Sequence, residues 1–151
     1  MRYWLFKTEP DVFSIDDLKA VGREPWNGIR NYQARNLLRD EVKAGDGVLI
    51  YHSSCKRVGV AGTATVVKAG YIDPDQFDPD DKYHDPKATV DKPRWYRVDV
   101  AFEQRFDDIV PLATLKSTTA LANMVLLKQG RLSVQPVTAA QWRCILKLAG
   151  V

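Results

Sequence analysis

Apolar and polar positions along the chain repeat with two different periods, which separates predicted strands from predicted helices. Residues 94–104, "RWYRVDVAFEQ", carry an apolar side chain at every second position from Tyr96 to Phe102, which predicts a half-buried strand. Shorter apolar or β-branched runs predict further strands at residues 2–7, 48–53, 59–70 and 130–137.

Three other segments have an apolar residue every three or four positions, and this spacing predicts amphipathic helices at residues 14–22, 32–42 and 138–150. Each begins with a side chain that can accept a hydrogen bond from the exposed N–H groups of the first turn. These capping residues are Ser14 with Asp17, Asn31, and Thr138 with Gln141. A short helix is also expected after Pro111, where a strand ends.

Strands with helices inserted between them predict an α+β fold, a small closed β-barrel of five to six strands with peripheral helices. At 151 residues, the chain is long enough to bury a core without disulfide support, so a single domain over residues 1–151 is expected. No apolar run reaches the length of a membrane span, and no signal peptide is recognisable. Cys55 and Cys144 form no closely spaced pair, which favours reduced thiols and a cytoplasmic location.

Charge is distributed unevenly. Residues 73–91 hold seven aspartates and two lysines, a local charge of −5, so a chain with a net charge of +3 carries +8 elsewhere. The surrounding segment, residues 71–94, has three Asp-Pro steps and a Lys-Pro step and is predicted to be a long loop. Its aromatic residues favour an ordered, packed loop. An acidic loop on a basic body can repel or frame a polyanion.

Metal binding and catalysis find little support in the pattern. His52 and Cys55 have an H-x-x-C spacing, but His84 and Cys144 are isolated, and a structural zinc site usually needs two close pairs. We therefore expect no metal and no cofactor. The run from His52 to Cys55 contains atoms suited to a nucleophile, yet neighbouring residues on a strand point to opposite faces.

Aromatic residues recur with amides and cations at the ends of the predicted elements. Trp26 follows a proline in a turn and Trp95 follows Lys-Pro-Arg at a loop end, whereas Trp4 and Trp142 fit the core. A nucleobase gains roughly 1–3 kcal/mol from stacking on an aromatic ring. Its edge needs donors and acceptors, and its phosphates favour arginine and helix N-termini. This inventory suits a base-binding pocket.

Six motifs, taken in order, resemble the EVE domain family over almost the whole chain. They are "WLFKTEP", "WNGIRNYQARN", "D-x-VLIYHS" (with Gly47 at x), "YHDPK", "PRW" and "RLSVQPV". The resemblance implies a PUA-like fold, related to the YTH readers of methylated RNA. It also implies a pocket for a modified base, such as methylated or hydroxymethylated cytosine, flipped from a strand of DNA or RNA.

The resemblance also suggests site residues. Candidates for the base pocket are Lys7, Thr8, Trp26, Asn31, Tyr32, His52, Ser53, Asp85, Trp95, Ser133 and Gln135. Of these, Trp26, Tyr32 and Trp95 are expected to form the wall, and His52 and Asp85 the rim. Candidates for phosphate contacts are Arg30, Arg35 and Arg131. The segment from Gly28 to Asp40 is interpreted as a helix whose N-terminus favours an anion.

The leading hypothesis is therefore a non-enzymatic reader of nucleic acid, without membrane association. An alternative is an enzyme that acts on modified nucleotides or bases through Glu9, His52 or Asp85. A third is a protein adaptor that uses the acidic loop.

Overall fold

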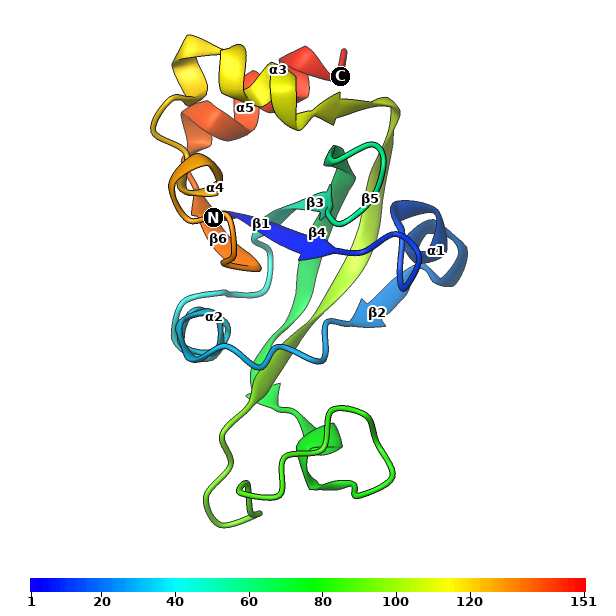
Figure 1. The fold of residues 1–151 in the computed structure, drawn as a ribbon, viewed down its shortest axis with the longest axis vertical. Helices are drawn as coiled ribbons and strands as arrows, with labels where there is room; N and C mark the ends of the chain where they lie inside the picture. The colour runs from blue at the N-terminus through cyan, green and yellow to red at the C-terminus, as the bar shows by residue number, and fades with distance from the viewer.

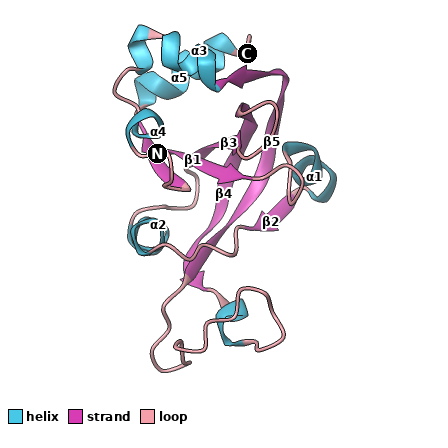
Figure 2. Ribbon diagram, in the orientation of Figure 1, coloured by secondary structure: helices cyan, strands magenta, loops and turns pink.

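A six-stranded mixed sheet forms the centre of the computed structural model, which describes residues 1–151 (Figures 1 and 2). The strands are β1 (Tyr3–Thr8), β2 (Arg23–Pro25), β3 (Gly47–His52), β4 (Gly59–Ile72), β5 (Tyr96–Pro111) and β6 (Val134–Val137). Their order is β2-β5-β4-β3-β1-β6, with only β1 and β3 parallel. The α+β class, the strand number and the peripheral helices are confirmed.

The expected closure into a barrel is not found, because the sheet stays open between β2 and β6. Both end strands are short and contain a proline, Pro25 or Pro136. Proline donates no hydrogen bond to a ladder and so suits a sheet edge. In contrast, β4 and β5 form a long antiparallel pair that runs along the length of the molecule (Figure 1). Several register shifts in this pair increase its twist.

Five α-helices and two short 3-10 helices lie around the sheet. They are α1 (Ile15–Val21), α2 (Tyr32–Asp40), η1 (Pro74–Phe77), α3 (Leu112–Ser117), η2 (Thr119–Leu121), α4 (Val125–Lys128) and α5 (Ala139–Leu148). The predicted caps are confirmed: Ser14 and Thr138 form capping boxes, and Asn31 Oδ1 accepts a hydrogen bond from Ala34 N at 3.0 Å. The strand β2 was not predicted, because Pro25 and the Asn-Gly pair that follows it indicate a turn.

The two faces of the sheet bury separate apolar clusters. Phe6 faces the cluster that holds residues of α1 and α2, and Leu5 faces the cluster that holds residues of α3, α4 and α5. Trp4 belongs to the first cluster, as expected for a core residue, and its indole donates to Asp46 at 2.9 Å. Trp142 stacks on Tyr3 at the edge of the second. The alternation along β1 therefore directs neighbouring side chains to opposite cores.

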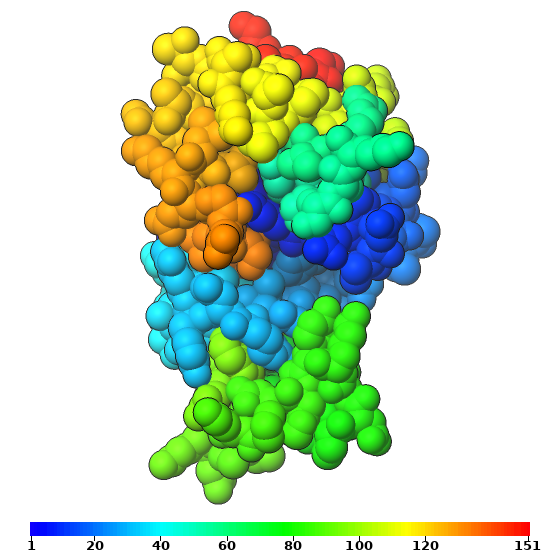
Figure 3. All heavy atoms as spheres, in the orientation of Figure 1, coloured from blue at the N-terminus to red at the C-terminus, as the bar shows by residue number.

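The acidic loop between β4 and β5 forms a lobe at one end of the molecule (Figures 1 and 3). Its base is closed by Gln76, which is fully buried. The Gln76 amide donates to the carbonyls of Asp73 and Trp95 at 2.6 and 2.9 Å and accepts from the N–H groups of Arg94 and Trp95. The loop is thus ordered, as predicted, although buried polar contacts hold its base. No helix in the structure has the length and apolarity needed to cross a membrane.

Candidate functional site

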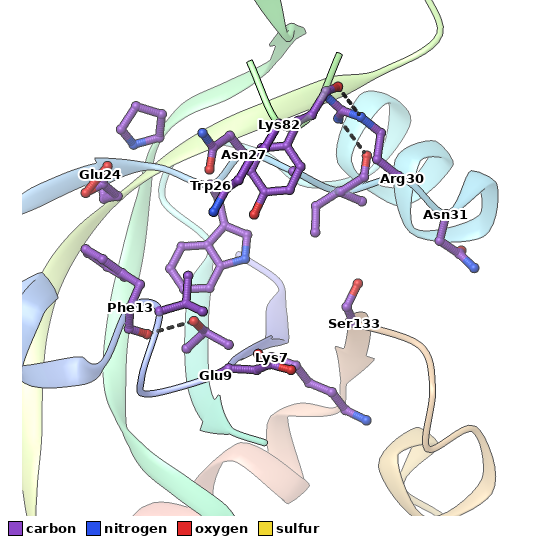
Figure 4. A pocket seen from close by; sticks show the side chains of 16 residues that line it. Lys7, Glu9, Phe13, Glu24, Trp26, Asn27, Arg30, Asn31, Lys82 and Ser133 are labelled. Carbon is purple, nitrogen blue, oxygen red and sulfur yellow. Dashed lines mark hydrogen bonds between the residues drawn. The ribbon is translucent and has the colours of Figure 1, made fainter. Parts of the chain in front are cut away.

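A cavity of about 500 Å³ opens where four segments of the chain meet (Figure 4). Its lining comes from the end of β1 and the following turn, from β2 and the turn before α2, from the acidic lobe, and from the residue before β6. Cavities of this size accommodate small ligands. Six predicted site residues lie in it: Lys7, Thr8, Trp26, Arg30, Asn31 and Ser133.

Trp26 serves both the core and the cavity. Its backbone N–H donates to Val98 at 2.7 Å, which continues the edge of the sheet beyond β2. The indole packs on Phe6 with centroids 5.7 Å apart and meets the edge of Phe13 at 6.2 Å, and the residue is only 7% exposed. Figure 4 places the indole at the centre of the lining, so an aromatic surface remains available to a ligand.

Polar groups around the indole differ in what remains available to a ligand. Thr8 uses its hydroxyl to donate to the Phe13 carbonyl at 2.7 Å, which fixes the turn after β1. Asn31 uses its Oδ1 to cap α2, so its amide nitrogen stays available. The Ser133 hydroxyl makes no hydrogen bond within the chain, and its carbonyl accepts from Lys7 N at 2.9 Å. Of these three residues, Asn31 and Ser133 therefore offer unused side-chain donors.

Tyr83, which belongs to the acidic lobe, packs on the turn at Gly28 beside the cavity. The absence of a side chain at Gly28 makes this contact possible. Gly28 has a φ of +77°, and a Cβ there would lie 2.5 Å from the Tyr83 ring. Only glycine meets both requirements without strain. Tyr83 and Lys82 belong to the lining although they were not selected as site residues. The Asn-Gly turn was visible in the sequence, but its aromatic partner 55 residues away was not.

Arg30 connects the cavity to the lobe. Its guanidinium donates twice to the Tyr83 carbonyl, at 3.1 and 2.7 Å, and pairs with the fully buried Asp73 at 3.0 Å. These contacts occupy most of the donors that a phosphate would need. Arg35 likewise donates to the Arg94 carbonyl at 2.5 Å and lies over the Tyr32 ring.

The other predicted wall residues form a separate cluster between α2 and the lobe. Tyr32 stacks on Trp95 with ring centroids 4.9 Å apart, and the Trp95 indole donates to Asp85 at 2.7 Å. This hydrogen bond lowers the pKa of the Asp85 carboxyl. None of the three lines the cavity. The cluster attaches the lobe to the first turn of α2.

Four further candidates also lie outside the lining. His52 is buried and its Nε2 accepts from Ile15 N at 3.1 Å, at the start of α1; burial lowers the pKa of its imidazole. Gln135 is fully buried beneath the segment before β6, with its Oε1 unpaired. Ser53 bonds the end of β1 through its backbone, and Arg131 is exposed. No three His, Cys, Asp or Glu side chains lie close enough together to hold a metal ion.

Glu9 also lines the cavity, and the sequence suggested it only for the alternative of an enzyme. The rest of the lining was not among the predicted site residues and consists of Val12, Phe13, Glu24, Pro25, Asn27, Gly28, Ile29, Lys82 and Tyr83. Glu24 lies two positions before Trp26, and burial is the largest influence raising the pKa of its carboxyl. Recognition of β2 would have placed Glu24 and Trp26 on the same face. Lys7 contributes its stem to the cavity, while its ammonium donates to the Gly130 carbonyl and lies 5.6 Å from the Tyr51 ring centre.

Comparison with known families matches residues 2–148 to the EVE domain. Thymocyte nuclear protein 1 from Danio rerio is 42% identical, in an alignment that covers 96% of this chain and 71% of that protein. The protein of the same name from Homo sapiens is 41% identical, with 97% and 73% covered.

Solved structures agree with this relationship. A hypothetical protein from Leishmania major superposes with a TM-score of 0.96 at 48% identity, covering 99% of this chain and 95% of that chain. Human THYN1 protein, solved in complex with 5-methylcytosine containing DNA, superposes with a TM-score of 0.94 at 40% identity, covering 100% and 99%.

Proposed function

The chain belongs to the EVE domain family, and from this membership we propose that it binds a nucleic-acid strand and holds one modified base, such as 5-methylcytosine, against Trp26. The observation that carries the proposal is an aromatic-lined cavity in a chain 40% identical, over its full length, to a protein solved with 5-methylcytosine containing DNA. DNA is the first substrate to test.

A base that has left its stack must regain in the cavity the free energy that extrusion costs. Extrusion costs a few kcal/mol, and stacking on an aromatic ring returns about 1–3 kcal/mol for each base. Donors at Asn31 and Ser133 and the Glu24 carboxylate can pair with the polar edge of a pyrimidine. A methyl group at C5 adds apolar surface, which suits a lining that contains Val12, Phe13 and Ile29.

The positions of the three candidates for catalysis, Glu9, His52 and Asp85, also favour a binding function over an enzymatic one. Glu9 lines the cavity, but His52 accepts a hydrogen bond from the start of α1 and Asp85 is held by Trp95. These three side chains therefore do not share a site. We propose that the protein acts without a catalytic step. The cytoplasmic location stays a prediction from the cysteine pattern.

The test is a titration of oligonucleotides that carry one 5-methylcytosine or one cytosine at the same position. We expect tighter binding of the modified strand and a loss of about tenfold for Trp26→Ala, from the missing stacking. Because Trp26 also fills the core, its truncation lowers the free energy of unfolding by roughly 3–5 kcal/mol, and circular dichroism must verify the fold.

A second variant avoids the core. Val12 lies in the lining and is 60% exposed, so Val12→Glu adds a negative charge beside the ligand without disturbing packing. Val21, 57% exposed on α1 and outside the lining, provides the matched control Val21→Glu. We expect weaker binding only for the first. Equal affinity for both oligonucleotides, with no effect of either cavity variant, would contradict the proposal.

A further inference from the structure

A second, smaller cavity of about 240 Å³ lies beside the first, and Lys7 lines both. The other lining residues are Tyr51, Leu112, Lys116, Leu126, Leu127 and Gly130. They come from β3, from α3, and from α4 with the turn that follows it. A ligand that fills the first cavity therefore meets the second at Lys7.

The second cavity has a positive and unbalanced set of charges. Lys7 and Lys116 line it, and no carboxylate does. Burial lowers the pKa of the Lys7 ammonium, because a charge held partly out of water lacks solvation. Its contacts within the chain, the Gly130 carbonyl and the face of Tyr51, bear no formal charge. An anion in this cavity would stabilise both ammonium groups.

Tyr51 supplies an independent indication. The residue is 3% exposed and lines the cavity, yet its hydroxyl forms no hydrogen bond within the chain. The hydroxyl is not itself enclosed by the protein, so it faces the open cavity and remains free to donate to a ligand there. Burial raises the pKa of this phenol to about 12, so it keeps its proton at neutral pH and can donate. Three donors thus surround one small space.

We propose that the second cavity binds the phosphodiester that flanks the extruded nucleotide, with Lys7, Lys116 and Tyr51 as its donors. The proposal rests on the function proposed above and assigns a phosphate subsite that the sequence did not indicate. It also replaces Arg30 and Arg35 as phosphate contacts, because both guanidinium groups are engaged with the chain.

Salt dependence distinguishes a phosphate contact from other effects. For a single strand, the logarithm of the binding constant falls with the logarithm of salt concentration, with a slope of about −0.7 for each neutralised phosphate. Anisotropy titrations of a single strand with one 5-methylcytosine are therefore repeated over a range of salt concentrations. We expect Lys116→Ala to make this slope shallower by roughly 0.7. Lys147→Ala, which removes an exposed lysine of α5 outside both cavities, should leave it unchanged.

Tyr51→Phe tests the neutral donor. The substitution keeps the ring under Lys7 and removes only the hydroxyl, so we expect a several-fold loss of affinity with the wild-type slope. Free 5-methyl-2′-deoxycytidine, which has no phosphate, provides the control ligand. Its affinity should be the same for the wild type, Lys116→Ala and Tyr51→Phe.

The outcomes separate the two proposals. A wild-type slope in Lys116→Ala, or an equal loss of nucleoside binding, would overturn the phosphate subsite. If the wild type binds the nucleoside as tightly as the oligonucleotide, the base pocket stands and the subsite is wrong. If the wild type binds neither, the proposed function fails and the subsite with it.

Discussion

His52 is a residue whose chemistry suggests a site but whose position serves the fold. It lies at the end of β3, and its Nε2 accepts the hydrogen bond of Ile15 N at the start of α1. Burial is the main cause that lowers the pKa of the imidazole below its ordinary value of 6.5, although Asp16 and Asp17 oppose it. A protonated ring could not accept this hydrogen bond, so the neutral form stabilises the fold.

The stability of the protein should therefore depend on His52 in mildly acidic solution. Since the pKa is lower in the folded state, the unfolded state binds more protons, and the contribution is complete above pH 6.5 and is lost as the pH falls below it. We expect the free energy of unfolding, from urea denaturation, to decrease between pH 7 and 5. His52→Gln should flatten this dependence, whereas His84→Gln in the lobe should preserve it. A slope unaffected by His52→Gln would contradict the assignment.

At the scale of elements, Arg30 links the segment before α2 to the acidic lobe. It precedes α2 and reaches into the lobe, where Asp73 is fully buried and accepts its ion pair. The same guanidinium holds the Tyr83 carbonyl, and Tyr83 packs on Gly28. Arg97 lies 3.7 Å from Asp73 and is the second cation beside it. The lobe is thus positioned relative to the turn that carries Trp26.

Removal of Arg30 should release the lobe. Arg30→Ala leaves the buried Asp73 carboxylate with the longer Arg97 contact as its one ion pair, beside the hydrogen bond from Asp75 N, and breaking a buried ion pair on one side typically costs on the order of 3 kcal/mol. We expect faster hydrogen exchange at lobe amides, such as that of Asp85, which bonds the Gln76 carbonyl. Binding of the modified oligonucleotide should weaken, because Tyr83 lines the cavity.

Arg57→Ala is the matched control for this variant. Its ion pair with Asp108 has side-chain exposures of 61% and 73%, so solvent already screens it. Lobe exchange and stability should match the wild type. If the lobe amides exchange at the same rate in Arg30→Ala and Arg57→Ala, Arg30 does not hold the lobe in place.

At the scale of the whole molecule, charge is divided between the acidic lobe and a body that carries +8. The lobe extends beyond the sheet (Figure 1) and contributes Lys82 and Tyr83 to the lining of the first cavity. The negatively charged lobe repels the phosphate backbone of a nucleic acid. A nucleic-acid strand without a base held in the cavity therefore gains less binding free energy from the positively charged body of the protein. We therefore expect the lobe to contribute to selectivity.

Neutralising three carboxylates of the lobe should reduce this selectivity. The triple variant Asp78→Asn, Asp80→Asn and Asp81→Asn keeps the oxygens that accept from Asp80 N and Tyr83 N. We expect the affinity for unmodified strands to rise more than that for modified strands at low salt. A control with the same charge change on β5 is Glu103→Gln, Asp107→Asn and Asp108→Asn. If both triples change the affinity ratio alike, net charge rather than the lobe is responsible.

Local physics explains what the sequence by itself determined. Helix caps at Ser14, Asn31 and Thr138 depend on residues three positions apart, and the alternation from Tyr96 to Phe102 depends on the strand period. The α+β class and the family resemblance follow from such patterns in order. They also led to Trp26, Asn31 and Ser133, which lie in the cavity.

Only the tertiary structure decided which of these side chains remain available to a ligand. Arg30 meets Asp73, Trp95 meets Asp85 and Tyr32, and Lys7 turns toward Gly130, contacts that join separate segments and have no periodic signal. The open sheet likewise depends on where two proline-containing strands end in space. A side chain's type limits what it can bind, but its partners depend on long-range packing, which a linear pattern does not encode.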